Sequence, residues 1–580
     1  MSKANSERQL PRLQRRLLAM LLIVAMVGAA CGAVDDFSSE VIGGPTGALP
    51  FAEEDSEPSG DATSDDSGQT EAGTRDGVAG DNNNETTADT PTEIAGPPRS
   101  GGSLVSNPNS DQDASDNPAD PTSPSTPSAP TVTTAPSTGG TSASTSTSTA
   151  PGSTAAPSTT AAPATTVAPP TTLAPEGVDL SNAVLASSYG FDANNATEAF
   201  RQALLSADPV IIIDDQGSDW MIDPIKVFDV TDKIIVFEPG VTVRARPGAF
   251  SASNAIMLNL VRPVGLEMYG NGATLDMNKS EYTTGEGRHA VALVAADGVT
   301  ISDFTISDSG GDGLYIAGHA PPLRTYSSNI YVDNVVFDNH RRQGMSIISA
   351  ENVFVSNSTF SNTIGTLPEA GVDLEPNQPY HRLVNINFDR SRFVNNGHAG
   401  FVVASLNLDE NSIPISVNVT NSYFSMNHRA GNAYSEAELV FGANRTSPVT
   451  GSVVFDNVEF DGSEWSLLKT RRPSDGYSVT MRNIVARDLM QTSGAGLINF
   501  EVPSYDEPGT LGNFHFENVT ATYTADVPVL YVFNGQTLTA MNNVTGSIDV
   551  RNPGDPAAIE YRVGEPPQEN NVTLTVRHIQ

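Results

Sequence analysis

The chain has 580 residues, one cysteine, and a formal net charge of −37 from 68 acidic and 31 basic residues. A single cysteine excludes an intramolecular disulfide, so stability must come from packing. The acidic balance disfavours nucleic acid, which needs basic patches that release counterions, so we expect no nucleic-acid partner.

The first segment, residues 1–31, has five basic residues followed by the apolar run LLAMLLIVAMVGAA. This run is shorter than the roughly 18 to 20 residues that cross hydrocarbon, which indicates a secretory signal peptide. The stretch VGAAC resembles the lipobox of bacterial lipoproteins. That resemblance implies lipidation of Cys31 and a protein anchored to the membrane at the cell surface; an ordinary secreted protein is the alternative.

Residues 32–175 consist mainly of Ser, Thr, Pro, Ala, Gly and Asp, as in TSASTSTSTAPGSTAAPSTTAAPATTVAPPTT. Such a segment cannot bury enough apolar surface to offset its conformational entropy, so we expect it to be disordered. Because proline-rich chain is extended, at up to about 3 Å per residue the segment could reach on the order of 400 Å. It is interpreted as an acidic stalk.

Residues 176–580 are expected to form one domain built from repeats. Segments 298–316, 329–348, 352–374 and 385–403 share an alternating strand, a break at Asn, Asp or Ser, a second short strand, a polar turn, and a glycine before a third strand. The second strands end at equivalent positions, which are Ile306, Phe337, Phe360, Phe393, Phe424 and Phe460. Short strands at this period without intervening helices predict an all-β, right-handed parallel β-helix with an apolar interior.

Two other architectures fit the sequence less well. Leucine-rich repeats share the period but need fixed Leu and Asn positions that are not found, and a β-sandwich would show tight hairpin turns. Before the first coils, NNATEAFRQALLSAD reads as a short amphipathic helix with Asn195 or Thr197 as its cap. This helix would cover the N-terminal end of the β-helix.

A helix followed by PVIIIDDQGSDWMI and KIIVFEPGVTVRARPGAF resembles the opening of the pectate-lyase-like superfamily. The resemblance spans roughly residues 185–560. It implies a groove over one parallel sheet where an extracellular polysaccharide binds, and it leaves the reaction open because the superfamily hosts many activities and some non-catalytic binders. Fragments such as GGDG and GHAG do not complete the polygalacturonase-like motif set, so no catalytic residue is transferred from that branch.

The strands expected to form the groove are HAVALV, DGLYIA, QGMSII, AGVDLE and AGFVVA. In this alignment one outward column contains His289, Asp312, Gln343, Ala370 and Ala399. The next outward column contains Ala292, Tyr315, Ser346, Asp373 and Val402, and Glu375 is the following outward residue on its strand.

Polar residues concentrate at one place in this groove. The turn NHRRQ adds His340, Arg341 and Arg342 about one coil from the carboxylates Asp373 and Glu375. Candidate substrate-binding residues are His289, Tyr315, Arg341, Gln343 and Ser346. Alternatively, Arg342 simply pairs with Asp373 or Glu375 and joins neighbouring coils.

Two reactions are compatible with this cluster. In hydrolysis, Asp373 would share the acid and base roles with Glu375 or Asp312, at Cα separations of about 6.6 and 10 Å. In β-elimination from a uronic acid, the base would be Tyr315, His340 or Arg342, and Asp373 and Glu375 would hold Ca²⁺. A non-catalytic glycan-binding or adhesin-like module is the alternative to an enzyme.

Other polar residues have simpler interpretations. Lys469 and Arg471 could line the same groove further along, or form coil-to-coil salt bridges with Glu436 or Glu438. His319 and His398 are expected to be solvated turn residues. We expect a monomer.

Overall fold

The computed structural model describes residues 175, 177–428, 437–491, 495–502, 509–534, 537–562 and 566–580, all of which belong to one compact unit. The expected signal segment 1–31, with Cys31, lies outside the described residues. So does the expected disordered stretch, apart from residue 175.

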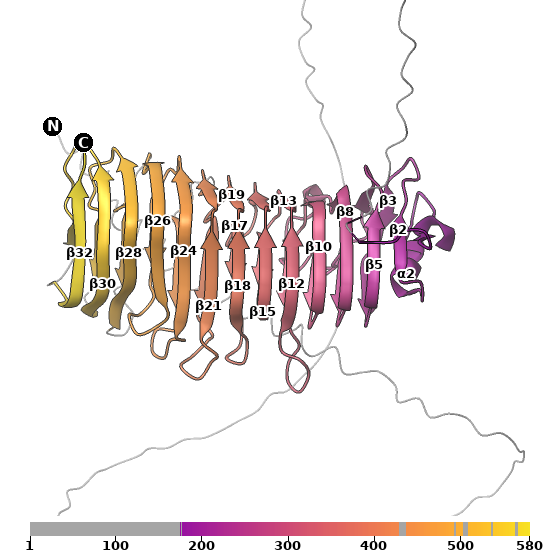
Figure 1. Ribbon diagram of the computed structural model, residues 1–580, viewed down its shortest axis with the longest axis horizontal. Coiled ribbons are helices and arrows are strands. Elements are labelled where there is room, and N and C mark those ends of the chain that lie inside the picture. The colour runs from indigo at the N-terminus through magenta and orange to yellow at the C-terminus, as the bar shows by residue number, and fades with distance from the viewer. Residues whose placement is uncertain are drawn as a thin grey trace, which may run out of the picture. The chain divides into compact units, whose positions relative to one another are not determined.

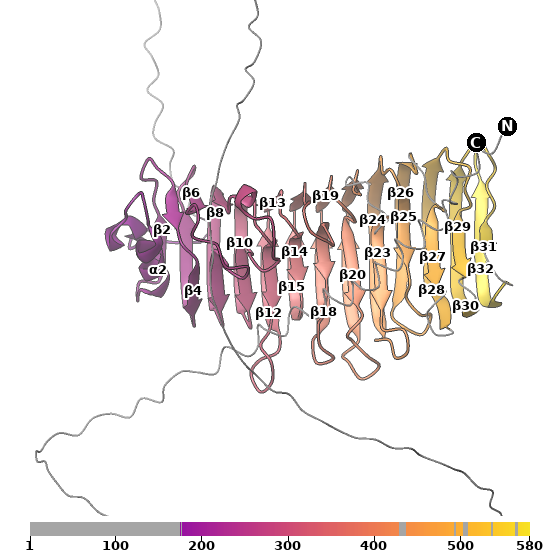
Figure 2. The same ribbon diagram turned by 180° about the vertical axis from the view of Figure 1, so that it is seen from behind.

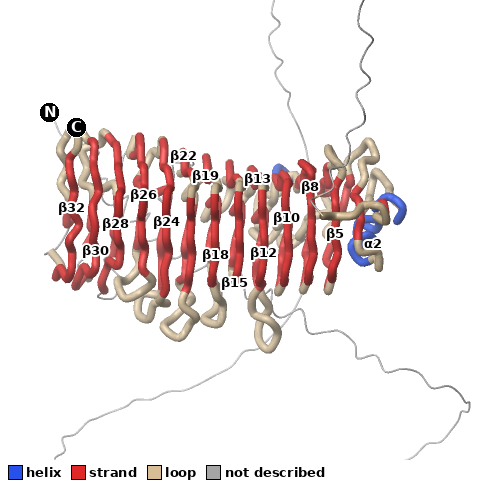
Figure 3. The backbone as a smooth tube through the Cα atoms, in the orientation of Figure 1, coloured by secondary structure: helices blue, strands red, loops and turns tan. Residues whose placement is uncertain are grey.

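The described residues form a β-solenoid in which each coil pairs in parallel with the next (Figures 1 and 3). The predicted all-β parallel β-helix is confirmed. One face is a 12-stranded sheet. Its strands are β4 (Ile225–Phe228), β7 (Leu258–Val261), β9 (Val291–Val294), β11 (Asp312–Ala317), β14 (Gln343–Ile347), β17 (Ala370–Leu374), β20 (Phe401–Ser405), β23 (Ala437–Ala443), β25 (Ser466–Thr470), β27 (Ile498–Val502), β29 (Leu530–Asn534) and β31 (Ile559–Arg562).

The remaining strands form a 20-stranded sheet that covers the other sides of the coils. They are β1 (Val184–Leu185), β2 (Val210–Ile213), β3 (Trp220–Ile222), β5 (Thr231–Phe237), β6 (Thr242–Ala245), β8 (Val264–Asp276), β10 (Asp297–Ser307), β12 (Ser327–Asp333), β13 (Val336–Asp338), β15 (Ala350–Ser356), β16 (Thr359–Ser361), β18 (Leu383–Asp389), β19 (Arg392–Val394), β21 (Ile415–Thr420), β22 (Tyr423–Ser425), β24 (Gly451–Asp461), β26 (Ser478–Leu489), β28 (Gly509–Tyr523), β30 (Leu538–Arg551) and β32 (Gln568–His578).

A column of aromatic side chains fixes the register of the central coils. The positions predicted to be equivalent pair with one another from Ile306 to Phe460. The rings of Phe360, Phe393 and Phe424 are fully buried and stack with centroids 5.2 and 4.4 Å apart. Each coil therefore locks onto the next through an identical interior contact.

Asparagine and aspartate form the corners between the first and second strands of the coils. Asn334, Asn421 and Asn483 have positive φ values of 52°, 51° and 52°, a conformation that Asn tolerates better than most residues. Their side chains also bond from coil to coil, as between Asn518 Nδ2 and Asn483 Oδ1 at 2.8 Å. The corner asparagines therefore join neighbouring coils as well as turning the chain.

The N-terminal end of the solenoid is covered by helix α2 (Thr197–Leu205), as predicted. Its buried face consists of Ala199, Phe200, Ala203 and Leu204. The predicted cap, Asn195 or Thr197, is wrong: the N-cap residue is Ala196, which has no side chain that can bond the first turn, although Asn195 Oδ1 accepts the amide hydrogen of Thr197 at 3.1 Å. No helix in the part of the chain that the structure describes is long and apolar enough to cross a membrane.

We predict that Phe393→Ala destabilises the solenoid by about 3 to 5 kcal/mol, because it removes a fully buried ring between two stacked neighbours. Urea denaturation of the full chain measures the change. Phe354→Ala is the matched control, since Phe354 is 37% exposed on the outer face and stacks only on Tyr331. It should cost less than about 1 kcal/mol, and equal losses in both variants would contradict the interior-column account.

Candidate functional site

The outward columns of the 12-stranded sheet have the predicted alignment. Tyr315 pairs with Ala292 and with Ser346, and Ser346 in turn pairs with Asp373. In the neighbouring column, Asp312 pairs with Gln343. Strands β11, β14 and β17 therefore present their polar side chains on one surface.

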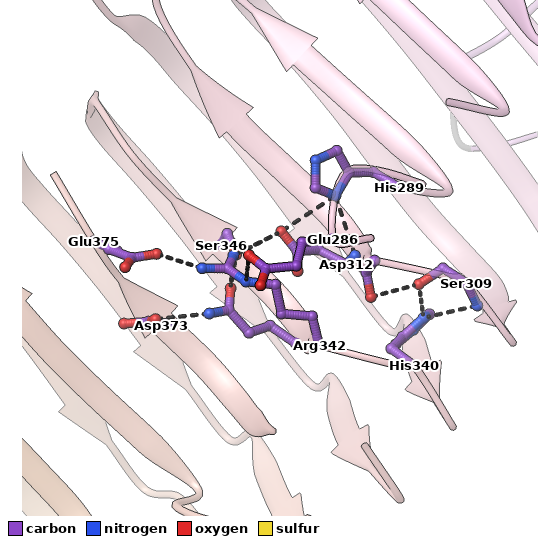
Figure 4. Close-up of polar contacts among 11 residues, drawn as sticks. Glu286, His289, Ser309, Asp312, His340, Arg342, Ser346, Asp373 and Glu375 are labelled. Atoms are coloured by element: carbon purple, nitrogen blue, oxygen red, sulfur yellow. Dashed lines mark hydrogen bonds and ion pairs between the residues drawn. The ribbon is translucent and has the colours of Figure 1, made fainter. Parts of the chain in front are cut away.

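Two carboxyl groups on this surface are connected through two intervening polar side chains. Ser346 Oγ donates to Asp312 Oδ2 at 2.8 Å, and Gln343 Nε2 donates to Asp373 Oδ2 at 2.7 Å. Ser346 also contacts Gln343 Oε1, which closes the link (Figure 4). The side chains come from three successive coils, so the stacking register sets their spacing.

Arg342 is the cation of the cluster. Its guanidinium lies 2.7 Å from Glu375 Oε2, 3.5 Å from Glu286 Oε2 and 3.6 Å from Asp312 Oδ2 (Figure 4). The coil-to-coil pairing considered as an alternative for Arg342 is thus present with Glu375. Burial lowers the pKa of Arg342, but the surrounding carboxylates outweigh burial and raise it, so this side chain stays charged at any working pH.

The pKa values of the two linked carboxyl groups are shifted from the ordinary value in opposite directions. Burial raises the pKa of Asp312, but the charges of His289 and Arg342 and a hydrogen bond from Ser346 outweigh it and leave the pKa below its ordinary value. Burial also raises the pKa of Asp373, and there the charge of Glu375 adds to it, so the pKa of Asp373 lies well above its ordinary value. The pKa values of the two linked carboxyl groups are therefore shifted in opposite directions, so Asp373 holds its proton to a higher pH than Asp312 does.

An aromatic wall borders the carboxyl pair. The rings of His289 and Tyr315 are stacked, with centroids 4.6 Å apart and an angle of 10° between their planes. His289 Nδ1 lies 3.1 Å from the Asp312 amide nitrogen and 3.2 Å from Asp312 Oδ2. His289 therefore contacts both the backbone and the side chain of Asp312 through one ring nitrogen.

Two residues of the predicted cluster lie away from the groove surface. His340 is fully buried, with its Nδ1 2.8 Å from Ser309 Oγ, and burial together with the charge of Lys279 lowers its pKa to about 3. A Cβ added at Gly313 would lie 2.5 Å from His340 Nε2, which shows that the ring occupies the space that this glycine leaves. Arg341 instead donates to the backbone carbonyls of Gly285 and Thr283.

The sequence interpretation missed Glu286, which contacts Arg342 from the loop before β9. This loop is bound to the coils by Arg341 and by Lys279, whose Nζ donates to the His340 carbonyl at 2.9 Å. The signal available in the sequence was the charged run GEGRHA directly before the first groove strand. The repeat period predicts the positions of strand residues but not of loop residues, so the contact between Glu286 and Arg342 could not be predicted from it.

The carboxylates do not fit the calcium site considered for an elimination reaction. Arg342 lies among Asp312, Glu375 and Glu286, in the position that a cation bridging them would take. Among the described residues, no group of three or more His, Cys, Asp or Glu side chains is arranged to hold a metal ion.

The second polar group on this sheet includes a partner that was not predicted, Glu501. Lys469 Nζ lies 3.2 Å from Glu501 Oε2, and Arg471 Nη2 lies 3.4 Å from the same oxygen. Glu438 cannot be their partner, because it is 1% exposed and bonds the buried amide of Asn427 at 2.6 Å. Glu436 lies outside the described residues.

The histidines expected at solvated turns are less exposed than predicted. His398 is fully buried, and its Nδ1 lies 2.8 Å from the Pro368 carbonyl oxygen. Burial lowers the pKa of His319, and the positive charge of Arg262 adds to this effect. Neither residue contributes to the groove cluster.

Comparison with known proteins identifies the type of solenoid. Residues 264–445 match the family described as "Right handed beta helix region", in agreement with the predicted hand. A search of curated proteins finds no significant match.

Several solved structures align with this chain at low identity. The catalytic unit of a GH87 α-1,3-glucanase from Streptomyces thermodiastaticus aligns with a TM-score of 0.49 and 12% identity, over 70% of this chain and 69% of that one. The Streptococcus pneumoniae surface protein and adhesin PfbA aligns with a TM-score of 0.41 and 14% identity, over 69% of this chain and 100% of that one. A polygalacturonase from Erwinia carotovora aligns with a TM-score of 0.36 and 12% identity, over 71% of this chain and 99% of that one.

We predict that Arg342→Met destabilises the protein by about 3 kcal/mol or more near pH 8, because it leaves buried carboxylates without their cation. In the variant the folded-state pKa values of these carboxyls rise above the unfolded values, so stability falls as pH rises through them. The deficit relative to the parent protein should therefore be larger at pH 8 than at pH 4.5, as measured by urea denaturation.

Arg341→Met is the matched control for this experiment. Arg341 is equally buried, but its donors bond backbone carbonyls, which do not titrate. Its deficit should therefore change much less between the two pH values than that of Arg342→Met. A pH-independent deficit in Arg342→Met would show that its carboxylate contacts contribute nothing specific.

Proposed function

We propose that the protein cleaves glycosidic bonds of an extracellular polysaccharide by hydrolysis in the groove over the 12-stranded sheet. Asp373 is the general acid and Asp312 is the base that activates water. The observation that carries the proposal is the opposite direction of their pKa shifts at two linked positions of one surface. Glycoside hydrolysis needs one carboxyl group that keeps its proton and one that is ionised, and pKa shifts in opposite directions favour this combination.

Hydrolysis is favoured over β-elimination because the candidate bases for elimination are unsuited to the task. Burial raises the pKa of Tyr315, which therefore keeps its proton, and Arg342 is held as a cation by its carboxylates. His340 has a pKa of about 3 but lies behind the sheet surface beside Ser309. A general base must reach the substrate and be unprotonated at the working pH.

Access to the pair depends on Arg342 and its partners. Asp312 is fully buried and Asp373 is 2% exposed, whereas the side chains of Glu375 and Glu286 are 21% and 45% exposed. Substrate hydroxyl groups would take over the guanidinium contacts that now go to these outer carboxylates. The stacked rings of His289 and Tyr315 would support a sugar ring at the same place.

We predict that Asp373→Asn and Asp312→Asn each lower turnover by about 100-fold or more, since each removes one proton-transfer group. The assay follows new reducing ends and the ultraviolet absorbance of unsaturated uronate, on neutral and uronic-acid polysaccharides. Hydrolysis gives reducing ends without absorbance. Asp303→Asn, at a corner where Asn is tolerated, should retain full activity. Elimination products from the parent protein would refute the assignment.

The burial of both carboxyls favours a second candidate, a non-catalytic glycan-binding module. In that case Arg342 and the outer carboxylates Glu375 and Glu286 bind sugar hydroxyls, and the inner pair only holds the coils together. The parent protein would then release no reducing ends from any polysaccharide, and the Asp373→Asn variant would still bind glycan. The same panel therefore separates the two candidates.

We further propose that the groove is displayed at the cell surface through a lipid on Cys31. The motif VGAAC after an apolar run supports this proposal. Expressed in a bacterial host with a lipoprotein pathway, the protein should partition with membranes and incorporate labelled palmitate. Cys31→Ser should abolish both, whereas Ala33→Ser should leave both unchanged. Soluble, unlabelled parent protein would contradict the proposal.

A further inference from the structure

A second charged cluster lies at the N-terminal end of the groove sheet, on the outward column that contains Tyr315. Along this column Tyr315 pairs with Ala292, Ala292 with Asn259, and Asn259 with Lys226. Three steps of about 4.8 Å place Lys226 on the order of 14 Å from Tyr315 along the solenoid axis. Lys226 belongs to β4, the first strand of this sheet, which Figure 2 labels at the indigo end beside α2. An extended chain that contacts Tyr315 and follows the groove in this direction would reach Lys226.

This N-terminal cationic cluster consists of Lys226 and Arg262 around the ring of Phe228. Lys226 Nζ and the guanidinium carbon of Arg262 each lie 5.4 Å from the centroid of that ring. Lys226 and Phe228 are the outward residues of β4 and are exposed, so the cluster lies on the surface of the sheet. The negative face of an aromatic ring attracts cations, which offsets part of the repulsion between these two.

One carboxylate among the described residues pairs with this cluster. Asp229 binds the Arg262 guanidinium through both of its oxygens, at 2.8 and 2.7 Å, and its side chain is 63% exposed. Lys226 Nζ makes no ion pair or hydrogen bond with any described residue. Asp223, which precedes Lys226 by three residues, is ion-paired with Arg246. An incoming anion therefore meets one cation without a carboxylate partner and one whose partner is open to solvent.

Asn259 lies between this cluster and Tyr315 and leaves its amide unpaired. The residue is outward on β7 and 9% exposed, its Oδ1 is a buried atom without a partner, and its side chain makes no hydrogen bond with the residues that the structure describes. Elsewhere on the solenoid surface such amides bond from coil to coil, as Asn418 Nδ2 does to Asn387 Oδ1 at 3.1 Å. Burying an unpaired amide is costly, and a bound ligand would supply the missing partner.

The backbone conformation at Arg262 is unusual for its residue type. Arg262 lies at the corner after β7 with φ of 56°, and the equivalent corners after β4 and β9 are Asp229 and Ala295, with φ of 55° and 54°. Asp and Asn adopt this left-handed conformation more readily than Arg does. The side chain explains the choice, because from this corner the guanidinium reaches back to Phe228 of the preceding coil.

The two clusters of the groove differ in charge. In the first, three carboxyl groups lie around one cation, Arg342. In the N-terminal cluster, two cations lie beside one carboxylate. Burial lowers the pKa of His319, and the charges of Arg262 and Lys226 lower it further, so both cations act on the loop that follows β11. A negatively charged group is therefore repelled at the first cluster and attracted at the second.

We propose that Lys226, Asn259 and Arg262 form a subsite for an anionic sugar, one that bears a carboxylate or a sulfate, at the N-terminal end of the groove. Lys226 supplies a point charge, Arg262 binds the anion through its planar guanidinium, and the Asn259 amide bonds the same sugar unit. Asp229 holds Arg262 in place and competes with the ligand for it. This inference rests on the proposed function in taking the groove as the glycan path, but its test measures binding alone.

The test compares probes of different charge by isothermal titration of the full-length protein. The probes are a dextran sulfate oligosaccharide, neutral dextran of the same length, and oligogalacturonate, which carries carboxylates. The parent protein should bind at least one anionic probe about tenfold or more tightly than dextran, and Lys226→Gln with Arg262→Asn should remove this preference. Asn suits the positive φ at position 262. Whichever anionic probe responds identifies carboxylate or sulfate as the ligand group.

Asn259→Ala tests the amide separately from the charges. It removes one polar contact and no charge, so binding of the responsive anionic probe should weaken about threefold or more. Because the Asn259 side chain bonds no described residue, this loss would not follow from a broken contact within the solenoid.

Asp229→Asn provides an opposite outcome. Asn tolerates the φ of 55° at this corner, while the charge that competes for Arg262 is removed. Binding of the responsive anionic probe should strengthen about threefold or more, and it should weaken as salt is added. A gain of affinity cannot result from misfolding. Arg482→Gln is the matched control, because its side chain is 42% exposed, against 39% for Arg262, and pairs with Asp456 on the other sheet, so it should change nothing.

Four results would overturn the subsite. These are equal affinity of the parent protein for dextran and both anionic probes or no binding of either anionic probe, a preference that survives Lys226→Gln with Arg262→Asn, unchanged binding in Asn259→Ala, and unchanged or weaker binding in Asp229→Asn. Asp373→Asn separates this inference from the proposed function. If it abolishes cleavage but keeps anionic-probe binding, both stand; if the parent protein prefers an anionic probe but does not cleave, only the hydrolysis proposal fails.

Discussion

Parallel pairing of each coil with the next, in a register fixed by the interior, is the constraint on which the remaining structure depends. The stacked rings of Phe360, Phe393 and Phe424 cannot shift by one residue without turning apolar side chains to solvent. Because the inward positions are fixed, the outward positions follow. Asp373, Ser346 and Tyr315 therefore form one column although they are far apart in the sequence.

Electrostatics then gives this column different properties along its length. Low exposure strengthens each charge interaction, so the few cations of an acidic domain have large local effects. His289 and Arg342 keep the pKa of Asp312 low against the effect of burial, while burial and the charge of Glu375 keep that of Asp373 high. Three coils further on, Lys469 and Arg471 both contact Glu501, and their charges lower its pKa.

The interior also contains polar groups, and these form hydrogen bonds from one coil to the next. Asn396 Nδ2 donates to Asn427 Oδ1 at 2.8 Å, and Asn427 Nδ2 donates to Glu438 at 2.6 Å. Burial raises the pKa of Glu438 to about 7, so the ladder ends in a carboxyl that ionises only with difficulty. A buried polar ladder is tolerated because each coil supplies the partner for the next.

The sequence by itself determined the solenoid, its helical cap and the residues that face the groove. The repeat period and strand alternation are local, and they placed Asp312, Gln343, Ser346 and Asp373 on one surface. Only the tertiary structure decided that His340 points behind the sheet, that Arg341 binds a loop and that Lys469 pairs with Glu501. The side chains of turns and loops follow no repeat period, so their contacts cannot be predicted from the sequence of a single coil. The pKa shifts depend on burial by neighbouring coils, so they cannot be predicted from a single coil either.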